Sequence, residues 1–181
     1  MLSKNNNYFK MKTKNLLKFM HILAWLAFIG LMIKSGSILF SYFLSLNDPE
    51  VSKNLFGEIY LYDFYTHSFW QYSFIVGYKF VFYAMEAFVA LLIIKLLKNL
   101  KLNDPFNEFV ATKMKQIGWA ITFLWIIAMI HNFHMPFTVA KHGLAMNLIS
   151  TDFIFLAFVI FIFTKIVQQG IDLKTENELT I

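Results

Sequence analysis

Four long apolar runs constrain this chain more than any other feature of its sequence. They lie near residues 19–46, 71–97, 117–135 and 148–167. A helix needs about 20 mainly apolar residues to cross a bilayer, and each run is close to that length or longer. With 58% hydrophobic and 15% charged residues, the 181-residue chain is also too apolar for a soluble domain. The sequence therefore predicts an all-α membrane protein with one domain, residues 1–181, that contains four transmembrane helices.

The positions of the lysines predict how these helices are oriented. Outside the runs, only Lys53 and Lys141 lie in the first and third connections. Apart from Lys34 and Lys79, which lie deep in the first two runs, the other lysines lie before the first run, around the second connection, or at the end of the fourth run and beyond it: Lys4, Lys10, Lys12, Lys14, Lys18, Lys95, Lys98, Lys101, Lys113, Lys115, Lys165 and Lys174. Positive residues collect on the cytoplasmic side of a membrane. We therefore expect both termini and the second connection in the cytoplasm, an N-in and C-in topology.

The residue types that are missing exclude several classes of function. The chain has no cysteine, which excludes disulfides and thiolate chemistry. All sixteen basic residues are lysines, so the arginine fork that suits phosphate recognition is absent. The sequence also shows no nucleophile beside a base, no paired carboxylates and no phosphate-binding glycine loop. We expect no enzymatic activity, no cofactor and no direct binding of nucleic acid.

The second connection has the residues of a helix start. Asp104 suits the N-cap, and Pro105 suits the first helical position because no backbone N–H is needed there. Phe106 and Phe109 then begin an apolar face at helical spacing. This pattern predicts an amphipathic cytoplasmic helix near residues 105–116, which lies at the membrane surface and leads into the third run. An ordinary loop between helices is the alternative.

The C-terminal tail, residues 168–181, mixes apolar and acidic side chains. Leu173, Leu179 and Ile181 alternate with Asp172, Glu176 and Glu178. Such a pattern can dock in a groove, here against the helix expected in the second connection. A frayed terminus is the alternative.

Three charged residues lie deep inside the apolar runs, away from their ends: Lys34 in the first run, and Lys79 and Glu86 in the second. Each charge costs roughly 2.5–3.5 kcal/mol near the membrane centre, so each needs a partner. A bridge from Lys34 to Glu86, with Lys79 extending outward, would satisfy them. Such a bridge can serve only to hold helices together, or it can form part of a pathway for a proton or an ion.

Two further patterns lie at the opposite side of the membrane from the termini. His131 and His134 share one helix face near Asp152, so a metal site can be drawn from them, although histidines at a helix end more often bond to backbone or headgroups. The first connection is aromatic from Tyr60 onward, which suits the membrane interface. The alternation of Tyr60, Tyr62 and Phe64 is also compatible with a short strand.

Two motifs carry a resemblance to a known family. The first is Asp104-Pro105-Phe106-Asn107 followed by Lys115-Gln116-Ile117-Gly118-Trp119, and the second is the terminal run from Gly170 to Ile181. The chain resembles the YoaS-like family of bacterial membrane proteins, domain-of-unknown-function family 2975. The resemblance implies four transmembrane helices, a bacterial inner membrane and genes that often neighbour small helix-turn-helix regulators. It implies no activity.

Both motifs lie on the side expected in the cytoplasm, and they predict a docking surface there. Its residues are Asp104, Pro105, Phe106, Phe109, Gly118, Glu176, Asn177, Leu179, Thr180 and Ile181. We expect a non-enzymatic regulatory or interaction protein that binds a cytoplasmic partner, with a helix-turn-helix regulator as one candidate. The alternatives are a small transporter or channel that uses the intramembrane charges, and a metal-binding membrane protein. A second copy of the chain could shield the charges, so a homo-oligomer stays open.

Overall fold

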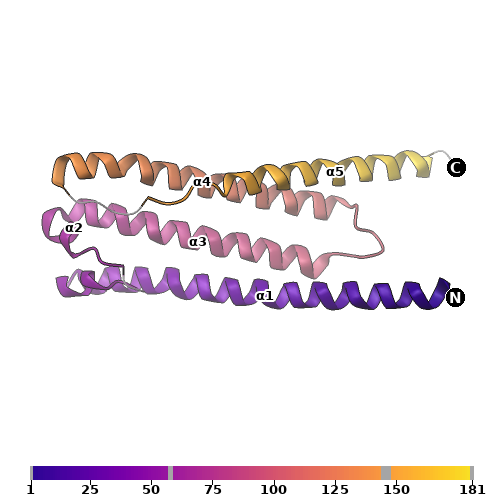
Figure 1. Ribbon diagram of the computed structural model, residues 1–181, viewed down its shortest axis with the longest axis horizontal. Helices are drawn as coiled ribbons and strands as arrows, with labels where there is room; N and C mark the ends of the chain where they lie inside the picture. Colours follow the sequence, from indigo (N-terminus) through magenta and orange to yellow (C-terminus); the bar gives the residue numbers. More distant parts are fainter. Residues whose placement is uncertain (1, 57–58, 144–147, 180–181) are drawn as a thin grey trace.

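The computed structural model describes residues 2–56, 59–143 and 148–179, and the side chains of residues 13–56, 59–138, 143 and 148–179 (Figure 1). The elements are α1 (Leu2–Ser45), the 3-10 helix η1 (Pro49–Lys53), α2 (Tyr62–His67), α3 (Phe69–Asn99), α4 (Glu108–His142) and α5 (Ile154–Leu179). Four segments are long and apolar enough to cross a membrane: Thr13–Ser45, Phe69–Asn99, Glu108–Thr138 and Ile154–Leu179. The all-α fold and the four transmembrane helices are thereby confirmed.

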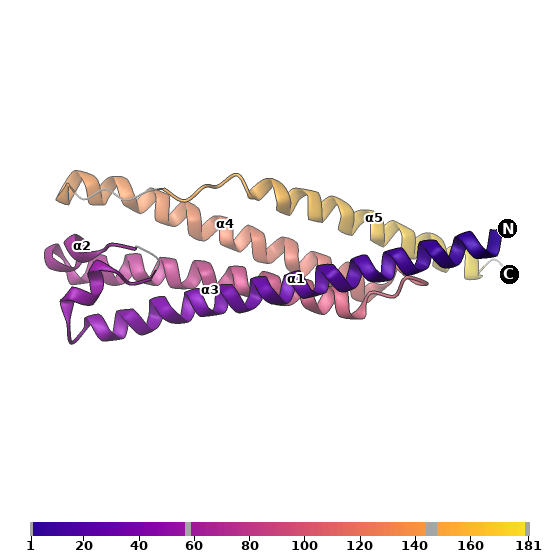
Figure 2. The same cartoon turned by 60° about the horizontal axis from the view of Figure 1, so that its bottom comes forward.

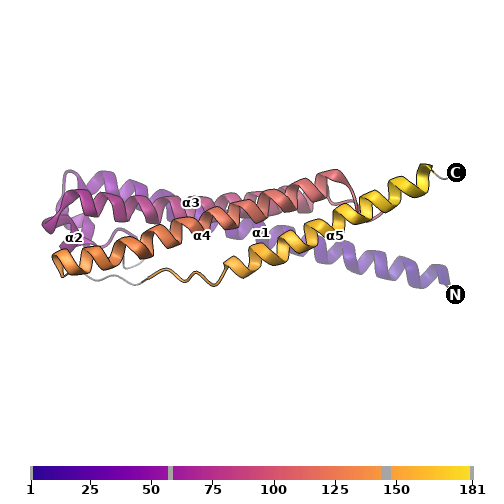
Figure 3. The same cartoon turned by 90° about the horizontal axis from the view of Figure 1, so that it is seen from above.

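The long helices form an open row rather than a closed ring. In the described part of the chain, the extensive contacts between them join α1 to α3, α3 to α4, and α4 to α5. Figure 2 shows this order, and Figure 3 shows α1 and α5 extending past the α3–α4 connection. Both termini lie at the same end of the molecule (Figure 1). We call this the lysine-rich end, and the opposite end, with η1 and α2, the loop end.

A seven-residue repeat on α1 forms its contact with α3. The repeat positions are half-buried or buried, while most other positions of α1 are exposed: Leu17, His21, Ala24, Phe28, Leu31, Ser35, Ile38, Tyr42 and Ser45. This spacing is the one that keeps a single stripe against a neighbouring helix. Polar bonds reinforce the stripe, because Ser45 Oγ and Tyr72 OH are 2.6 Å apart and Ser35 Oγ donates to the Phe80 carbonyl at 3.4 Å.

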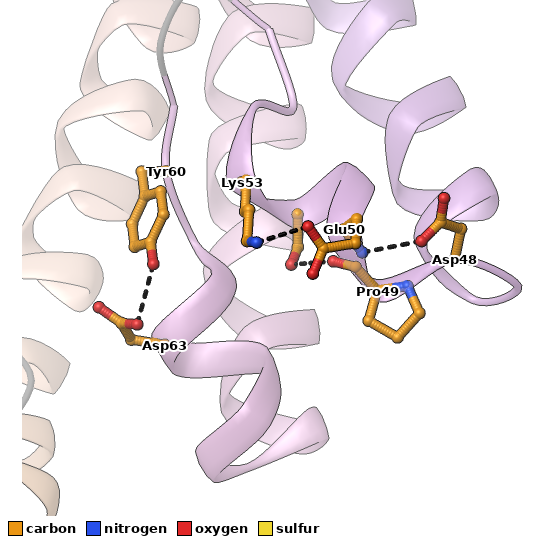
Figure 4. A network of polar contacts seen from close by, with 7 residues as sticks. Asp48, Pro49, Glu50, Lys53, Tyr60 and Asp63 are labelled. Atoms are coloured by element: carbon orange, nitrogen blue, oxygen red, sulfur yellow. Dashed lines mark hydrogen bonds and ion pairs between the residues drawn. The ribbon is translucent and has the colours of Figure 1, made fainter.

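The loop end is closed by a buried cluster that joins three helices. Ile38 of α1, Ile75 of α3 and Met135 of α4 belong to it, together with Leu55 and Leu61 of the first connection. Polar contacts fix the shape of that connection (Figure 4). Asp48 caps η1 by accepting the N–H of Glu50 at 3.0 Å, Lys53 pairs with Glu50, and Tyr60 OH donates to Asp63 at 3.0 Å. The aromatic run is therefore folded over the end of the helices.

The described residues contain no strand, so the strand alternative for the first connection is wrong. Tyr62 and Phe64 lie in α2, and Phe64 is buried because it packs into the cluster at the loop end. The alternating aromatic residues therefore belong to a short helix and to the segment that precedes it.

The helix ends differ from the apolar runs. α4 continues past residue 135 to His142 and stops before Gly143, whose φ of 67° is a left-handed conformation that glycine adopts without strain. α5 begins at Ile154, six residues after the expected start at 148, because residues 148–151 have no regular secondary structure and residues 152–153 form a turn. Apolar residues alone therefore did not determine where the fourth helix starts.

A glycine lies where α4 and α5 come together. A Cβ on residue 118 would lie 2.8 Å from the ring of Phe161, and Ile117, Ala120, Ile121 and Ala157 form the buried core around it. Small residues at such a contact let two membrane helices approach closely.

Replacing Gly118 with Leu should push α5 away from α4 and lower the free energy of unfolding by about 1–3 kcal/mol, as overpacking does elsewhere. Thermal unfolding in mild detergent, followed by circular dichroism, measures the effect. Gly36→Leu is the matched control, because a Cβ there meets nothing within 4 Å. Equal melting temperatures for the two variants would contradict this packing role.

Candidate functional site

The α3–α4 connection ends in a capped helix start, three residues later than expected. The helix begins at Glu108, and Asn107 is its cap: the N–H of Val110 donates to Asn107 Oδ1 at 3.1 Å. Asn107 Nδ2 also donates to the Asp104 carbonyl at 2.6 Å. The prediction of Asp104 as N-cap and Pro105 as first helical residue is therefore wrong. No separate helix covers residues 105–116, since those from 108 onward are the first turns of α4 itself.

Two contacts attach this connection to α5. The ring of Phe106 lies over Gly170, where an added Cβ would come within 2.7 Å of the ring. Beside it, Lys174 Nζ and Asp104 Oδ1 form an ion pair of 3.2 Å. Both side chains of this pair are about half-exposed, and such pairs contribute little stability by themselves. We call Phe106, Gly170, Asp104 and Lys174 the loop clamp.

The loop clamp joins the two family motifs. Residues 104–107 contact residues 170 and 174, which places the expected docking residues of the connection beside the start of the tail. These segments were expected to lie together, but no pattern in the sequence indicates that Asp104 pairs with Lys174. That pair joins residues 70 positions apart.

The other expected docking residues fall into three groups. Pro105, Phe109, Glu176, Asn177 and Leu179 are exposed, and Leu179 is 83% exposed. Gly118 is buried under Phe161, so its place in an exposed docking surface is wrong, and it belongs to the packing of α4 on α5. Thr180 and Ile181 lie outside the described residues.

The last turns of α5 continue beyond the α3–α4 connection as an exposed helix (Figure 3). Its exposed side chains include Asp172, Leu173, Glu176 and Leu179. A helix that shows both acids and leucines to its surroundings can bind a basic, partly apolar surface. The loop clamp supports this helix near its base.

The three intramembrane charges do not pair as expected. The ammonium of Lys34 lies over the ring of Tyr83, 4.0 Å from its centroid, and the ion pairs found among the described residues do not include Lys34 with Glu86. The expected bridge is therefore not formed as a direct contact. Lys34 is nevertheless close enough to interact electrostatically with both Lys79 and Glu86. The two lysines repel each other, and Glu86 offsets one of the two positive charges.

His131 extends this cluster to a third helix. It is fully buried, its ring lies edge-on to Tyr78 at 5.9 Å, and it interacts electrostatically with Lys79. Nothing in the spacing along the chain indicates that α4 packs against this face of α3. The histidines were therefore not expected beside the lysines.

Asn132 fixes the state of the His131 ring. Asn132 Nδ2 donates to the Ile149 carbonyl at 2.8 Å, and Asn132 Oδ1 accepts the Ile149 N–H at 2.9 Å. Because that oxygen is an acceptor, His131 Nδ1, which is 3.3 Å away, must be the donor. The neutral ring then carries its lone pair on Nε2. This atom and His134 Nε2 are buried and have no hydrogen-bond partner in the described part of the chain.

The metal site drawn from the sequence is not assembled. Asp152 is exposed at the start of α5, where its carboxylate accepts a hydrogen bond from Ser150 at 3.1 Å, while His131 and His134 point to Tyr78 of α3. Within the described residues, no three His, Asp or Glu side chains are placed to share a metal ion. The three-ligand site of His131, His134 and Asp152 is therefore wrong.

Comparison with protein families identifies the chain. It matches the family described as proteins of unknown function, DUF2975, over residues 60–181. The chain belongs to this family. The DUF2975 match includes α2 to α5 and both parts of the loop clamp, whereas α1 and Lys34 lie before it. Searches among curated proteins and among solved structures found no match. This protein is thus a multi-pass membrane member of a family without an assigned function.

Asn132→Ala should release the segment that precedes α5, because both hydrogen bonds to Ile149 are lost. Leaving such groups unpaired costs about 1–3 kcal/mol. Hydrogen exchange followed by mass spectrometry should show faster exchange in peptides that cover residues 148–153. Asn99→Ala is the control, since the Asn99 side chain bonds only one turn back in its own helix, to the Lys95 carbonyl at 2.9 Å. Unchanged exchange in the Asn132 variant would contradict the anchoring role.

Proposed function

We propose that this DUF2975 protein is a non-enzymatic regulatory or interaction protein of the bacterial cytoplasmic membrane. In this proposal both termini face the cytoplasm, in agreement with the collection of lysines at the end where the termini lie. The observation that carries the proposal is the loop clamp. Phe106 on Gly170 and Asp104 with Lys174 support a helical extension of α5, on which the side chains of Asp172, Glu176 and Leu179 are exposed.

The surface offered to a partner is acidic with apolar positions. Asp172, Glu176 and Leu179 are exposed on the extension, and Phe106 at its base is 44% exposed. Charge complementarity favours a partner with a basic groove that accepts one helix. A small helix-turn-helix regulator has suitable charge, since its surface must be basic in order to bind DNA. Bound at the membrane through that basic surface, such a regulator would be kept from its DNA.

Affinity capture from the native membrane in mild detergent tests this function, with mass spectrometry of the proteins that co-purify. Phe106→Ala should reduce recovery of the partner severalfold, because it removes both the exposed ring and the support of Gly170. Replacing residues 176–181 with a Gly/Ser segment of equal length should abolish recovery.

Phe155→Ala is the control for this capture, since Phe155 is 72% exposed but lies near the start of α5, away from the lysine-rich end. Recovery of the same partner from all four proteins would refute the docking surface. Recovery of only further copies of the chain would refute it as well and would show a homo-oligomer.

A second candidate function is the passage of a proton or an ion. The observation that favours it is the spread of the charge cluster over three helices, from Lys34 on α1 through Lys79 and Glu86 on α3 to His131 on α4. Ionisable residues inside a membrane often mark such pathways.

For this second function, Glu86→Gln should stop proton or ion flux into reconstituted vesicles, because the amide cannot exchange a proton. Glu50→Gln, an exposed change at the loop end, should leave the flux unaltered. A flux for the unmodified protein no greater than that of empty vesicles would remove this candidate.

A further inference from the structure

A groove runs between α3 and α4 at the lysine-rich end. Its volume is about 870 Å³, within the range of about 300–1,000 Å³ that is usual for small-molecule sites. The groove is separate from the loop clamp, none of whose four residues lines it. Its lining includes Met85, Lys95, Lys113, Lys115, Trp119 and Ile126.

The groove is divided into an apolar wall and a basic mouth. Its wall extends toward the centre of the membrane as far as Met85 and Ile126, whereas Lys95, Lys113 and Lys115 lie at the end near the α3–α4 connection. From Lys95 to Met85 the helix rises about 15 Å. This length is about half of the 30 Å hydrocarbon core of a bilayer, and therefore about the depth of one leaflet.

The lysines at the mouth have no acidic partner among the described residues. None of the described residues that line the groove is Asp or Glu. The ion pairs found among the described residues are those of Lys53 and Lys174, and Lys113 Nζ instead donates to Gln116 Oε1 at 2.8 Å. Three positive charges at one membrane surface therefore remain available to a negatively charged group.

We propose that this groove binds a phospholipid with an anionic headgroup. The phosphate lies among Lys95, Lys113 and Lys115, and one acyl chain lies along the wall toward Met85 and Ile126. Basic pockets between transmembrane helices bind anionic headgroups in this manner. A zwitterionic headgroup binds less well, because its own positive charge is repelled by the three lysines.

Trp119 supports the choice of a lipid and reports on its presence. Its side chain is 60% exposed and lies between the basic mouth and the apolar wall. Tryptophan favours that level of a membrane, where its ring is apolar and its N–H can reach a polar group. A bound lipid would therefore lie directly against the indole ring.

Quenching of Trp119 by brominated lipids tests the proposal. The full-length chain carrying Trp25→Phe, Trp70→Phe and Trp125→Phe retains Trp119 as its only tryptophan. It is reconstituted in phosphatidylcholine bilayers that contain a small fraction of brominated phosphatidylglycerol or the same fraction of brominated phosphatidylcholine. The anionic lipid should be enriched about tenfold at Trp119, given the attraction that each lysine near a membrane surface contributes. Equal quenching by the two lipids would overturn the proposal.

Two variants separate a built site from general surface charge. Replacing Lys95, Lys113 and Lys115 with Gln should reduce the preference to near one. Replacing Lys14, Lys18 and Lys165 with Gln removes the same charge from exposed positions outside the groove, and this control should keep the preference. Circular dichroism melting shows that both variants are folded. A preference that survives the first change, or falls equally with both changes, would overturn the site.

Discussion

The contact of α3 with α1 on one side and α4 on the other holds the whole row together. Lipid chains are as apolar as leucine, so burial of apolar surface contributes little to this association. Hydrogen bonds and close approach contribute instead: Ser45 with Tyr72, Ser35 with the Phe80 carbonyl, and the small residue Gly118 under Phe161. These contacts are spread along the row, and each joins only two neighbouring helices. The arrangement leaves α1 and α5 with one partner each.

The polar residues of the membrane part follow from this arrangement. α3 lies between α1 and α4, so its charged residues can interact with side chains of either neighbour. Lys34 of α1 interacts with both Lys79 and Glu86, and His131 of α4 interacts with Lys79. The cluster at the loop end closes the same three helices above them through Ile38, Ile75 and Met135. Charges inside a membrane are costly, so the fold keeps them at an energetic cost.

The sequence predicts the helices well and their ends poorly. The four apolar runs predicted the four transmembrane helices, because length and hydropathy alone decide whether a helix can cross a membrane. The start of α4 was misplaced because Asp104-Pro105 has the residues of a helix start. Asn107 performs the capping, while Asp104 pairs with a lysine 70 positions away. Rules that use only neighbouring residues in the sequence cannot show whether a side chain caps a helix or pairs with a distant residue.

The candidate site shows the same limit. Its two segments were correctly expected to be neighbours, yet the roles of single residues depended on packing: Phe106 lies over Gly170, and Gly118 is buried. The link between Asn132 and Ile149 was equally invisible, since an asparagine in a helix carries no sign of its partner 17 positions later. The alternation of Tyr60, Tyr62 and Phe64 fitted a strand and a short helix alike, and only the cluster around Phe64 decides between them.

The α3–α4 connection is the place where the proposed activities meet. Phe106 and Asn107 precede the first turn of α4, and Lys113 and Lys115 lie one to two turns further along the same helix. A partner on the α5 extension and a lipid in the groove would thus both order the beginning of α4. When two ligands order the same segment, the second ligand to bind causes a smaller loss of conformational entropy than the first. Each ligand then raises the affinity of the protein for the other without a change in the shape of the protein. The lipid composition of the membrane would then set how firmly the protein holds its partner. An open row of helices permits this form of control, whereas a closed bundle does not need it.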